Sequence, residues 1–258
     1  MNLSGFTAIV TGGLSGLGRA TATELADAGN TVAVFDLPRE DGEQLAAEIG
    51  ESVRYFPVDV ADAEQVEAAV DQVAALGPLR VVVNCAGVAT PGKVLGRDGV
   101  LPLERFERVL RVNVTGTFNV IRCAAQKMSE LDALSDGYGR SERGVIVNTA
   151  SVAAFDGQIG QPAYAASKGA VASMTLPLAR ELARHEIRVM TIAPGIFSTP
   201  MMAGLPQEAQ DSLGAQVPHP SRLGQPAEYA QLVRHIVENS MLNGEVIRLD
   251  GAIRMAPR

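Results

Sequence analysis

Three features of the sequence predict an α/β fold, a doubly wound parallel sheet with helices on both faces. Short apolar runs alternate with segments of helical spacing along the whole chain. A glycine-rich turn, residues 11–18, lies between the first apolar run and the first helical segment. The 258 residues are enough for one such domain, and no repeat, linker or composition break divides them. We therefore predict that residues 1–258 form a single domain.

The predicted strands are short runs of apolar residues, many of them β-branched. Such runs are typical of parallel strands that are buried on both faces. Asp36 closes the second strand, and Asn84-Cys85-Ala86-Gly87 follows the fourth. The seven predicted strands are residues 6–10, 31–35, 53–58, 79–83, 144–149, 188–193 and 245–249.

The predicted helices have apolar residues three and four positions apart. The first helix stops at Gly29, and Asp62 stands where it can cap the third. Pro177 lies inside the helix that starts at Pro162 and should bend it, because proline removes one backbone hydrogen bond. The predicted helices are residues 17–28, 39–49, 62–76, 102–128, 162–185 and 226–238.

Three stretches show neither the apolar runs of the predicted strands nor the three-to-four-residue apolar spacing of the predicted helices. Residues 91–101 are rich in glycine, and residues 129–143 are polar and irregular. Residues 194–220 are rich in proline, glycine and methionine and are longer than an ordinary connection in a compact domain. We therefore predict a substrate lid at about residues 195–220.

The charge balance and the spacing of cysteine and histidine residues limit the nucleic-acid and metal partners that we expect. Lysine and arginine number 22 against 29 aspartate and glutamate residues, a net charge of −7, whereas nucleic-acid-binding domains are usually basic. This balance argues against a nucleic-acid partner without excluding a local basic patch. The two cysteines form no ligand pattern or disulfide framework, and the three histidines lack metal-ligand spacing. We expect reduced thiols and no metal.

No apolar stretch approaches the ~20 residues that a membrane span requires. The first predicted strand begins by about Phe6, which leaves no room for a signal or transit peptide before it. We therefore expect a soluble, cytoplasmic protein without a membrane partner.

The turn from Thr11 to Gly18 is a candidate phosphate-binding site. A glycine turn alone often serves only tight packing, and this spacing differs from G-x-G-x-x-G. Its place between a strand and a helix favours backbone N–H groups that bind a dinucleotide's phosphates. In this interpretation Gly12 permits the sharp exit from the strand and Gly16 the close approach of the pyrophosphate. Gly18 permits close packing of the helix on the sheet.

Asp36 favours NAD over NADP. A carboxylate at the end of the second strand can accept hydrogen bonds from the adenosine ribose hydroxyls. It would also repel a 2′-phosphate, since like charges at about 4 Å cost on the order of 4 kcal/mol at an effective dielectric of about 20. Leu37 follows it, although Arg39 is close, and a helix-capping aspartate is the alternative interpretation. Asp59 and Val60, at the end of the third strand, are candidates to hold the adenine edge.

Tyr164 and Lys168 are candidates for proton transfer. Their four-residue spacing places both side chains on the same face of a helix. There the ammonium group can lower the phenol's pKa from its usual value of about 10, helped by a positive nicotinamide. Ser151, after the fifth strand, can donate a hydrogen bond to a substrate oxygen. A proton-transferring tyrosine beside a nicotinamide indicates hydride transfer at a carbinol carbon.

These motifs form a set that extends over the whole chain. It comprises the TGxxxGxG turn, Asn84-Cys85-Ala86-Gly87, Asn113 within residues 112–116, Ser151, Tyr164-x-x-x-Lys168 and Pro194-Gly195. The set resembles the short-chain dehydrogenase/reductase family, which implies a Rossmann fold. Within that family, residues 148–161, 190–200 and 243–255 look like the type II 3-hydroxyacyl-CoA dehydrogenases.

The resemblance implies a role for each matching residue. Tyr164 is implied to be the general acid/base, and Lys168 to hold the nicotinamide ribose and tune the phenol. Ser151 is implied to bind the substrate oxygen. Asn113 is implied to steady, through its backbone carbonyl, a water that links Lys168 to solvent. Gln158 matches a position near the acyl part of the substrate. The implied NAD contacts are Gly12, Ser15, Gly16, Leu17, Gly18, Asp36, Asp59, Val60, Cys85, Ala86, Gly87, Tyr164, Lys168, Phe197 and Thr199.

The resemblance therefore implies NAD-dependent oxidation of (3S)-3-hydroxyacyl-CoA to 3-oxoacyl-CoA, with a tyrosine as the general base. It also implies a homotetramer that pairs through the helices from Pro102 and Pro162. Two alternatives stay open: an NAD-dependent alcohol or hydroxysteroid dehydrogenase of the same family, and a non-catalytic dinucleotide-binding scaffold. The four intact polar residues of the catalytic set argue against the scaffold. Residues 91–101 and 129–143 match no motif and are candidate borders of the substrate entrance, so the acyl-chain length and alternative alcohol substrates stay open. The sequence also does not determine the direction of reaction.

Overall fold

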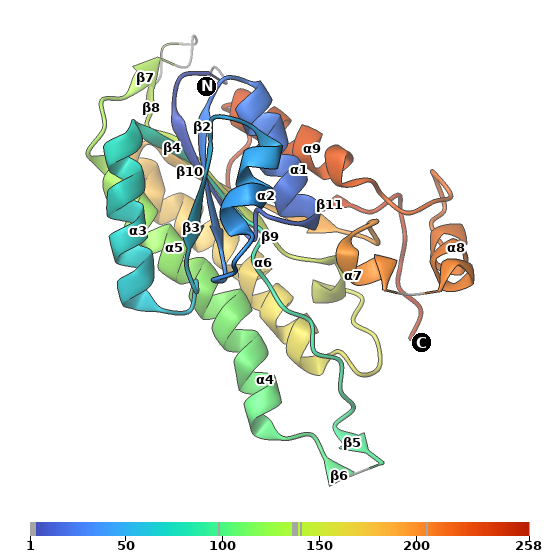
Figure 1. The fold of residues 1–258 in the computed structure, drawn as a ribbon. Helices are drawn as coiled ribbons and strands as arrows, with labels where there is room; N and C mark the ends of the chain where they lie inside the picture. Colours follow the sequence, from blue (N-terminus) through green and yellow to red (C-terminus); the bar gives the residue numbers. More distant parts are fainter. Residues whose placement is uncertain (1–3, 98, 136–138, 140, 205, 258) are drawn as a thin grey trace.

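A seven-stranded, entirely parallel sheet forms the centre of the fold. The computed structural model describes residues 4–97, 99–135, 139, 141–204 and 206–257. The strands of the sheet are β1 (Thr7–Thr11), β2 (Thr31–Asp36), β3 (Val53–Pro57), β4 (Leu79–Asn84), β9 (Gly144–Thr149), β10 (Ile187–Pro194) and β11 (Val246–Leu249). Their order across the sheet is β11-β10-β9-β4-β1-β2-β3 (Figure 1). The predicted fold class is confirmed, with strand boundaries within about two residues of those predicted.

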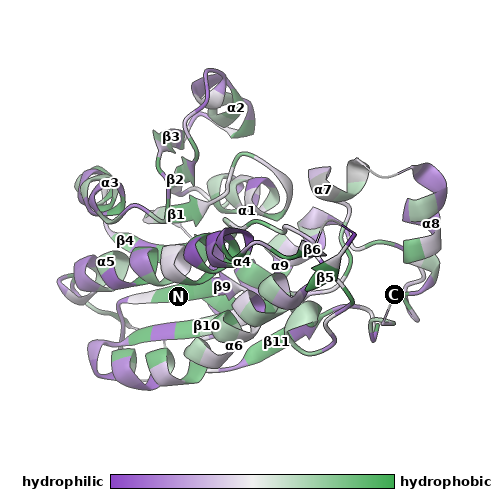
Figure 2. Cartoon of the chain, turned by 90° about the horizontal axis from the view of Figure 1, so that it is seen from below, coloured by the Kyte–Doolittle hydropathy of each residue, from purple (hydrophilic) through white to green (hydrophobic). Residues whose placement is uncertain are grey.

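Helices cover both faces of this sheet. They are α1 (Gly16–Asp27), α2 (Gly42–Ile49), α3 (Ala63–Leu76), α4 (Leu103–Leu110), α5 (Thr117–Ser129), α6 (Pro162–Leu182) and α9 (Pro226–Glu238). Because side chains alternate along a strand, β1 contributes Ala8 and Val10 to the core under α1, α2 and α9, and Ile9 to the core under α3, α5 and α6. Figure 2 shows the apolar strands between helices that carry polar residues on their outer sides.

Two helix ends agree with the cap and the stop that the sequence predicts. Asp62 caps α3 as predicted, since its Oδ1 accepts hydrogen bonds from the backbone N–H groups of Glu64 (3.0 Å) and Gln65 (3.1 Å). After α1 the chain turns at Gly29, whose φ of +88° is readily adopted only without a side chain. Pro177 lies inside α6, and the bend that it should cause stays a prediction.

The segment predicted as one long helix, residues 102–128, contains a wider turn. The chain runs from α4 through a π-helical turn, Arg111–Gly116, into α5. A π-helical turn adds about one residue per turn and occurs often at functional sites. The sequence pattern contained no signal for this turn, because one extra residue leaves the apolar spacing on either side intact.

The three stretches predicted as irregular contain short elements. Residues 91–101 include the hairpin of β5 (Leu95–Gly96) and β6 (Gly99–Val100), which projects from the body of the molecule at the bottom of Figure 1. A second hairpin pairs β7 (Leu134–Ser135) with β8 (Ser141–Glu142). Strands of two residues have no detectable alternation, so sequence patterns miss them. Residues 98, 136–138 and 140 of these stretches lie outside the described residues.

The predicted lid also contains helices. Residues 195–220 include α7 (Pro200–Ala203) and α8 (Gln207–Ala215), and residue 205 lies outside the described part of the chain. Both helices lie beside the C-terminal end of the chain in Figure 1. The segment is therefore structured rather than a plain loop.

A buried ion pair joins β10 to β8, and the same arginine also contacts the end of α9. The Nε of Arg188 donates to Oε1 of Glu142 at 2.6 Å, and the two side chains are only 8% and 5% exposed. The remaining guanidinium nitrogens donate to the backbone carbonyls of Ile236, Leu242 and Val237 at 2.8–3.0 Å. Carbonyls in the last turn of a helix lack hydrogen-bond donors within the helix. Arg188 supplies such donors to the carbonyls of Ile236 and Val237.

Arg188→Met should lower the free energy of unfolding by about 3–5 kcal/mol, because it leaves a buried carboxylate and several carbonyls without a partner. Urea denaturation measures this loss. Arg234→Met is the matched control, since Arg234 pairs with Glu24 and is 50% exposed. That variant should lose no more than about 1 kcal/mol. Equal losses in the two variants would contradict the role given to the buried pair.

Candidate active site

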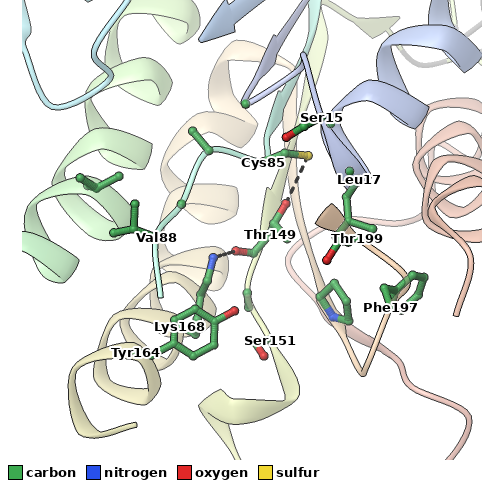
Figure 3. Close-up of a pocket in the computed structure, with 18 of the residues that line it drawn as sticks. Ser15, Leu17, Cys85, Val88, Thr149, Ser151, Tyr164, Lys168, Phe197 and Thr199 are labelled. Carbon is green, nitrogen blue, oxygen red and sulfur yellow. Dashed lines mark hydrogen bonds between the residues drawn. The ribbon is translucent and has the colours of Figure 1, made fainter. Parts of the chain in front are cut away.

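A pocket of about 890 Å³ opens at the carboxyl ends of the sheet strands. In doubly wound sheets ligands bind at this edge, where the strand order reverses, which here is between β1 and β4. Every residue predicted to contact cofactor or substrate lines this one pocket. These are Gly12, Ser15, Gly16, Leu17, Gly18, Asp36, Asp59, Val60, Cys85, Ala86, Gly87, Ser151, Gln158, Tyr164, Lys168, Phe197 and Thr199. Figure 3 shows several of them around the opening.

The glycine turn presents backbone to the pocket. Gly12 has a φ of +63°, and a Cβ there would lie 3.0 Å from the Cα of Ala86. A Cβ on Gly18 would lie 2.2 Å from the carbonyl oxygen of Gly12. Side chains at these two positions are therefore excluded by packing. At Gly16 a Cβ would lie 3.5 Å from Thr199, another lining residue, so a side chain there would take space from the pocket.

Thr11 fixes the start of this turn to the neighbouring strand. Its Oγ1 accepts hydrogen bonds from the backbone N–H groups of Cys85 (3.1 Å) and Ala86 (3.0 Å), directly after β4. The two chain segments on either side of the reversal point are thus held together at the pocket floor. Thr11 had no role in the prediction beyond its place in the motif.

Asp36 lies at the end of β2 and lines the pocket. Its carboxylate accepts hydrogen bonds from the backbone N–H groups of Leu14 (3.2 Å) and Leu37 (2.9 Å). The N-cap of α2 is Asp41, so the alternative interpretation of Asp36 as a helix cap is wrong. Arg39 pairs with Asp41, with Nε–Oδ1 at 2.5 Å, so its guanidinium is already held by another carboxylate.

Lys168 is buried under the end of β9. Its Nζ donates a hydrogen bond to the backbone carbonyl of Thr149 at 2.7 Å, and the residue is 5% exposed. Burial disfavours the charged form and lowers the pKa of this lysine to about 8. The ammonium group lies 5.8 Å from the centre of the Tyr164 ring, and both residues project from the same face of α6, as predicted (Figure 3).

The pKa of Tyr164 moves in the direction opposite to our expectation. Burial raises it above the usual value, and hydrogen bonding with Ser151 lowers it again only in part. The ammonium group of Lys168 points at the Thr149 carbonyl and does not offset the desolvation of the phenol. The helical spacing predicted the shared face correctly but contained no information about burial.

Ser151 begins a single 3₁₀ turn, Val152–Ala154. Its Oγ accepts a hydrogen bond from the backbone N–H of Ala153 at 3.1 Å, which fixes the side chain at the pocket wall. The hydroxyl hydrogen is therefore not used in this contact. Figure 3 shows the Ser151 hydroxyl and the Tyr164 ring on the same side of the pocket.

Asn113 does not line the pocket and is fully buried in the π-helical turn. Its side-chain amide exchanges hydrogen bonds with the backbone of Val88, at 2.8 and 2.9 Å, and donates to Ser167 on α6 at 3.0 Å. Its backbone carbonyl accepts a hydrogen bond from the Thr117 hydroxyl at 2.8 Å. Asn113 thus joins the segment after β4 to α6, while its implied contact with a water stays a prediction.

Two residues of the site had no place in our expectations. The Thr149 hydroxyl donates to the Asn84 carbonyl at 2.6 Å and lies 2.7 Å from the hydroxyl of Tyr229. Tyr229, on α9, is fully buried, and its hydroxyl lies 3.7 Å from the Cys85 thiol. Burial raises the pKa of both Cys85 and Tyr229, so both are neutral near neutral pH. In the sequence, Tyr229 is one of several residues on the apolar face of a helix. Nothing in the sequence therefore distinguishes it as a neighbour of the site.

Two other kinds of site are not found in the part of the chain that the structure describes. No group of three or more His, Cys, Asp or Glu residues has the arrangement of a metal site. No helix there is long and apolar enough to cross a membrane.

Comparison with known proteins places this architecture in a family. The family model for the short chain dehydrogenases matches residues 6–210. The 3-hydroxyacyl-CoA dehydrogenase type-2 of Bos taurus is 52% identical over 259 residues, which cover 99% of this chain and 98% of that protein.

Solved structures agree with this match. The crystal structure of 3-hydroxyacyl-CoA dehydrogenase type-2 from Mycobacterium avium is 39% identical and aligns with a TM-score of 0.91 over 98% of this chain and 97% of that one. A 3-ketoacyl-(acyl-carrier-protein) reductase from Brucella melitensis, solved with NADH, is 30% identical with a TM-score of 0.85 over 98% of this chain and 100% of that one. The chain therefore belongs to the short-chain dehydrogenase family.

Proposed function

We propose that the chain oxidises (3S)-3-hydroxyacyl-CoA to 3-oxoacyl-CoA with NAD as the hydride acceptor. The observation that carries this proposal is the convergence of Ser151, Tyr164 and Lys168 at one end of the pocket that also contains the glycine turn and Asp36. The similarity to 3-hydroxyacyl-CoA dehydrogenase type-2 proteins supports the substrate class. The stereochemical label rests on the sequence resemblance alone.

The residues of the pocket fit a nicotinamide dinucleotide. The turn without side chains at Gly12 and Gly18 offers its backbone to a pyrophosphate, and Asp36 offers carboxylate oxygens to ribose hydroxyls. Phe197 and Thr199 line the same pocket, beyond β10. When bound, the dinucleotide accepts or supplies the hydride. We propose NAD rather than NADP, because Asp36 has no free basic neighbour among the described residues of this loop.

The protein's own residues move and hold the proton. Tyr164 takes the hydroxyl proton of the substrate during oxidation and returns a proton during reduction. The Ser151 hydroxyl donates a hydrogen bond to the same substrate oxygen and stabilises its developing charge. Oxidation requires the phenolate, which each positive charge in the pocket favours, that of Lys168 included. Thr149 keeps Lys168 in place by accepting its hydrogen bond.

The acyl end of the pocket is apolar. Val152, Ala153, Ile196, Met202, Leu213 and Met255 line it. We propose that residues 195–220 serve as the lid, because Met202 of α7 and Leu213 of α8 belong to this lining. The same apolar lining would accept another apolar alcohol, so a related alcohol or hydroxysteroid dehydrogenase is the second candidate. The homotetramer and the cytoplasmic location stay predictions.

Tyr164→Phe should reduce the consumption of NADH in the presence of acetoacetyl-CoA by at least about a hundredfold, because a positioned acid or base contributes about 10²–10⁴ to the rate. The affinity for NADH, measured by fluorescence titration, should stay close to that of the wild type. A fully active variant would disprove the proposed mechanism. Turnover of a free alcohol but of no short acyl-CoA by the wild type would favour the second candidate.

Asp36→Ser should shift the ratio of kcat/KM with NADPH to kcat/KM with NADH by at least about tenfold toward NADPH, because it removes a charge that repels the 2′-phosphate. Steady-state kinetics with both cofactors measures the ratio. Asp27→Ser makes the same change of charge at the exposed end of α1 and should leave the ratio unchanged. An unchanged ratio in both variants would contradict the role of Asp36.

Lys168 should make stability depend on pH in a defined window. Its pKa falls from 10.5 to about 8 on folding, so between these values the unfolded chain binds more protons than the folded one. Stability due to this group therefore rises as pH increases from 8 toward 10.5. Relative to Lys168→Met, the wild type should gain on the order of 1–3 kcal/mol across the window. Urea denaturation at several pH values measures it, and a relative loss would contradict the burial of a charged lysine.

A further inference from the structure

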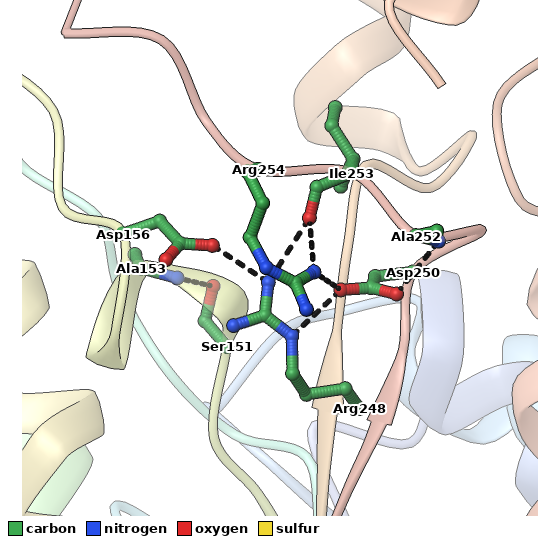
Figure 4. A network of polar contacts seen from close by, with 8 residues as sticks. All are labelled: Ser151, Ala153, Asp156, Arg248, Asp250, Ala252, Ile253 and Arg254. Carbon is green, nitrogen blue, oxygen red and sulfur yellow. Dashed lines mark hydrogen bonds and ion pairs between the residues drawn. The ribbon is translucent and has the colours of Figure 1, made fainter. Parts of the chain in front are cut away.

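The end of the chain is fixed against the segment that carries Ser151. We call residues 151–161 the Ser151 segment and residues 250–257 the C-terminal tail. Arg248, at the end of β11, contacts both (Figure 4). Its Nη2 donates to Oδ2 of Asp156 at 2.6 Å, and its Nε donates to Oδ2 of Asp250 at 2.7 Å. One guanidinium group thus binds two carboxylates at once, which its planar fork allows and a lysine cannot reproduce.

The contact with Asp156 is one turn away from Ser151. The backbone N–H groups of Phe155 and Asp156 both donate to the Val152 carbonyl, at 2.9 and 2.8 Å. Ser151 closes the other side of this turn through its hydrogen bond from Ala153. Arg248 also lies over the ring of Phe155, 5.3 Å from its centre. The position of Asp156 therefore determines the position of the whole turn.

The tail makes two further contacts with the Ser151 segment. The side-chain amide of Gln158 donates to the Ala256 carbonyl at 2.9 Å, and the backbone N–H of Ile159 donates to the Pro257 carbonyl at 3.0 Å. Between these contacts and β11, Met255 lines the pocket itself. Gln158, which we predicted to lie near the acyl part of the substrate, thus has its amide nitrogen held by the tail.

The path of the tail is set by Asp250. Its Oδ1 accepts a hydrogen bond from the backbone N–H of Ala252 at 3.0 Å, and Ala252 adopts a left-handed φ of +68° that reverses the chain. Arg254 donates to Oδ2 of Asp250 at 3.3 Å and to the Ile253 carbonyl at 2.7 Å. The Asp250 side chain is 8% exposed and is shielded from water, whereas the Arg254 side chain is 63% exposed.

We propose that Asp156, Arg248 and Asp250 are positioning residues that set the place of the Ser151 hydroxyl and the width of the acyl end of the pocket. None of the three lines the pocket, so they act only through the Ser151 segment and the tail. The proposal rests on the proposed function, because it assigns Ser151 to the substrate oxygen. Its physical reason is geometric: a displacement of about 1 Å of a group at the reacting centre can cost about a hundredfold in rate.

The test compares Asp156→Asn, Arg248→Met and the double variant with the wild type. With acetoacetyl-CoA and NADH, each single variant should lower kcat/KM by about 10–100-fold and raise KM, while the Kd for NADH stays within about twofold. The double variant should be no worse than the single ones, since both residues act as one unit. Asp71→Asn is the control, because it breaks a 2.8 Å ion pair with Lys127 on the outer side of α3.

A chain that ends at Met255 provides a second measurement. It lacks the carbonyls that bind Gln158 and Ile159 but retains the ion pairs of Arg248. Its KM for acetoacetyl-CoA should rise while kcat changes less, because Asp156 still holds the turn of Ser151. A purely stabilising network would lower the unfolding midpoint and the amount of active protein, but would not move KM at a fixed NADH affinity.

Kinetic constants of Asp156→Asn equal to those of the Asp71→Asn control would overturn the proposal. If Asp156→Asn does not fold, Arg248→Met decides, and kinetic constants equal to those of the control would overturn the proposal as well. An unchanged KM in the shortened chain would overturn the part of the proposal in which the tail sets the width of the acyl end. A wild type that consumes no NADH with acetoacetyl-CoA would instead disprove the proposed function. The same variants are then compared on the alcohol that the wild type does oxidise. Failure of the positioning proposal is thereby distinguished from failure of the proposed function.

Discussion

The hydrogen bond from the buried Lys168 ammonium group to the Thr149 carbonyl is the interaction on which the site depends. A charge away from water is costly unless it is hydrogen-bonded, so this lysine requires an acceptor at a fixed place. Thr149 provides it because the last residue of β9 has a carbonyl that faces α6 at 2.7 Å from Nζ. Thr149 is in turn held by Asn84 at the end of β4 and by Tyr229 on α9. Two strands and two helices therefore determine where one amine lies.

The same burial shifts the pKa of both titrating groups beside Ser151. It lowers the pKa of Lys168 and raises that of Tyr164, so both groups shift toward their neutral forms. In such a medium a further charge has a larger effect than it would have in water. A positive charge bound in this pocket would therefore add to that of Lys168 in favouring the phenolate. In the proposed function, the dinucleotide would supply such a charge when bound.

Much of this arrangement could be predicted from the sequence, because it depends on residues close together in the chain. The seven strands follow from apolar runs, the cap of α3 from Asp62, and the crowded positions Gly12 and Gly18 from a turn between strand and helix. What could not be predicted depends on contacts between distant residues. Thr149 meets Tyr229 80 residues later, and Gln158 meets Ala256 98 residues later. The raised pKa of Tyr164 belongs to this second group, since burial is a property of the folded chain.

The two ends of the pocket are accordingly built by different means. The end that fits a dinucleotide is formed by backbone that excludes side chains, and the residues that we propose to select NAD lie near the ends of β1 and β2. The end that we propose for the acyl group is lined by side chains from the Ser151 segment, α7, α8 and Met255, which come together only in the folded molecule. Local motifs were therefore sufficient to predict hydride chemistry, whereas the residues that we propose to select the substrate come together through tertiary contacts. A change in the tail or in the lid can alter that choice and leave the glycine turn, Lys168 and Tyr164 in place.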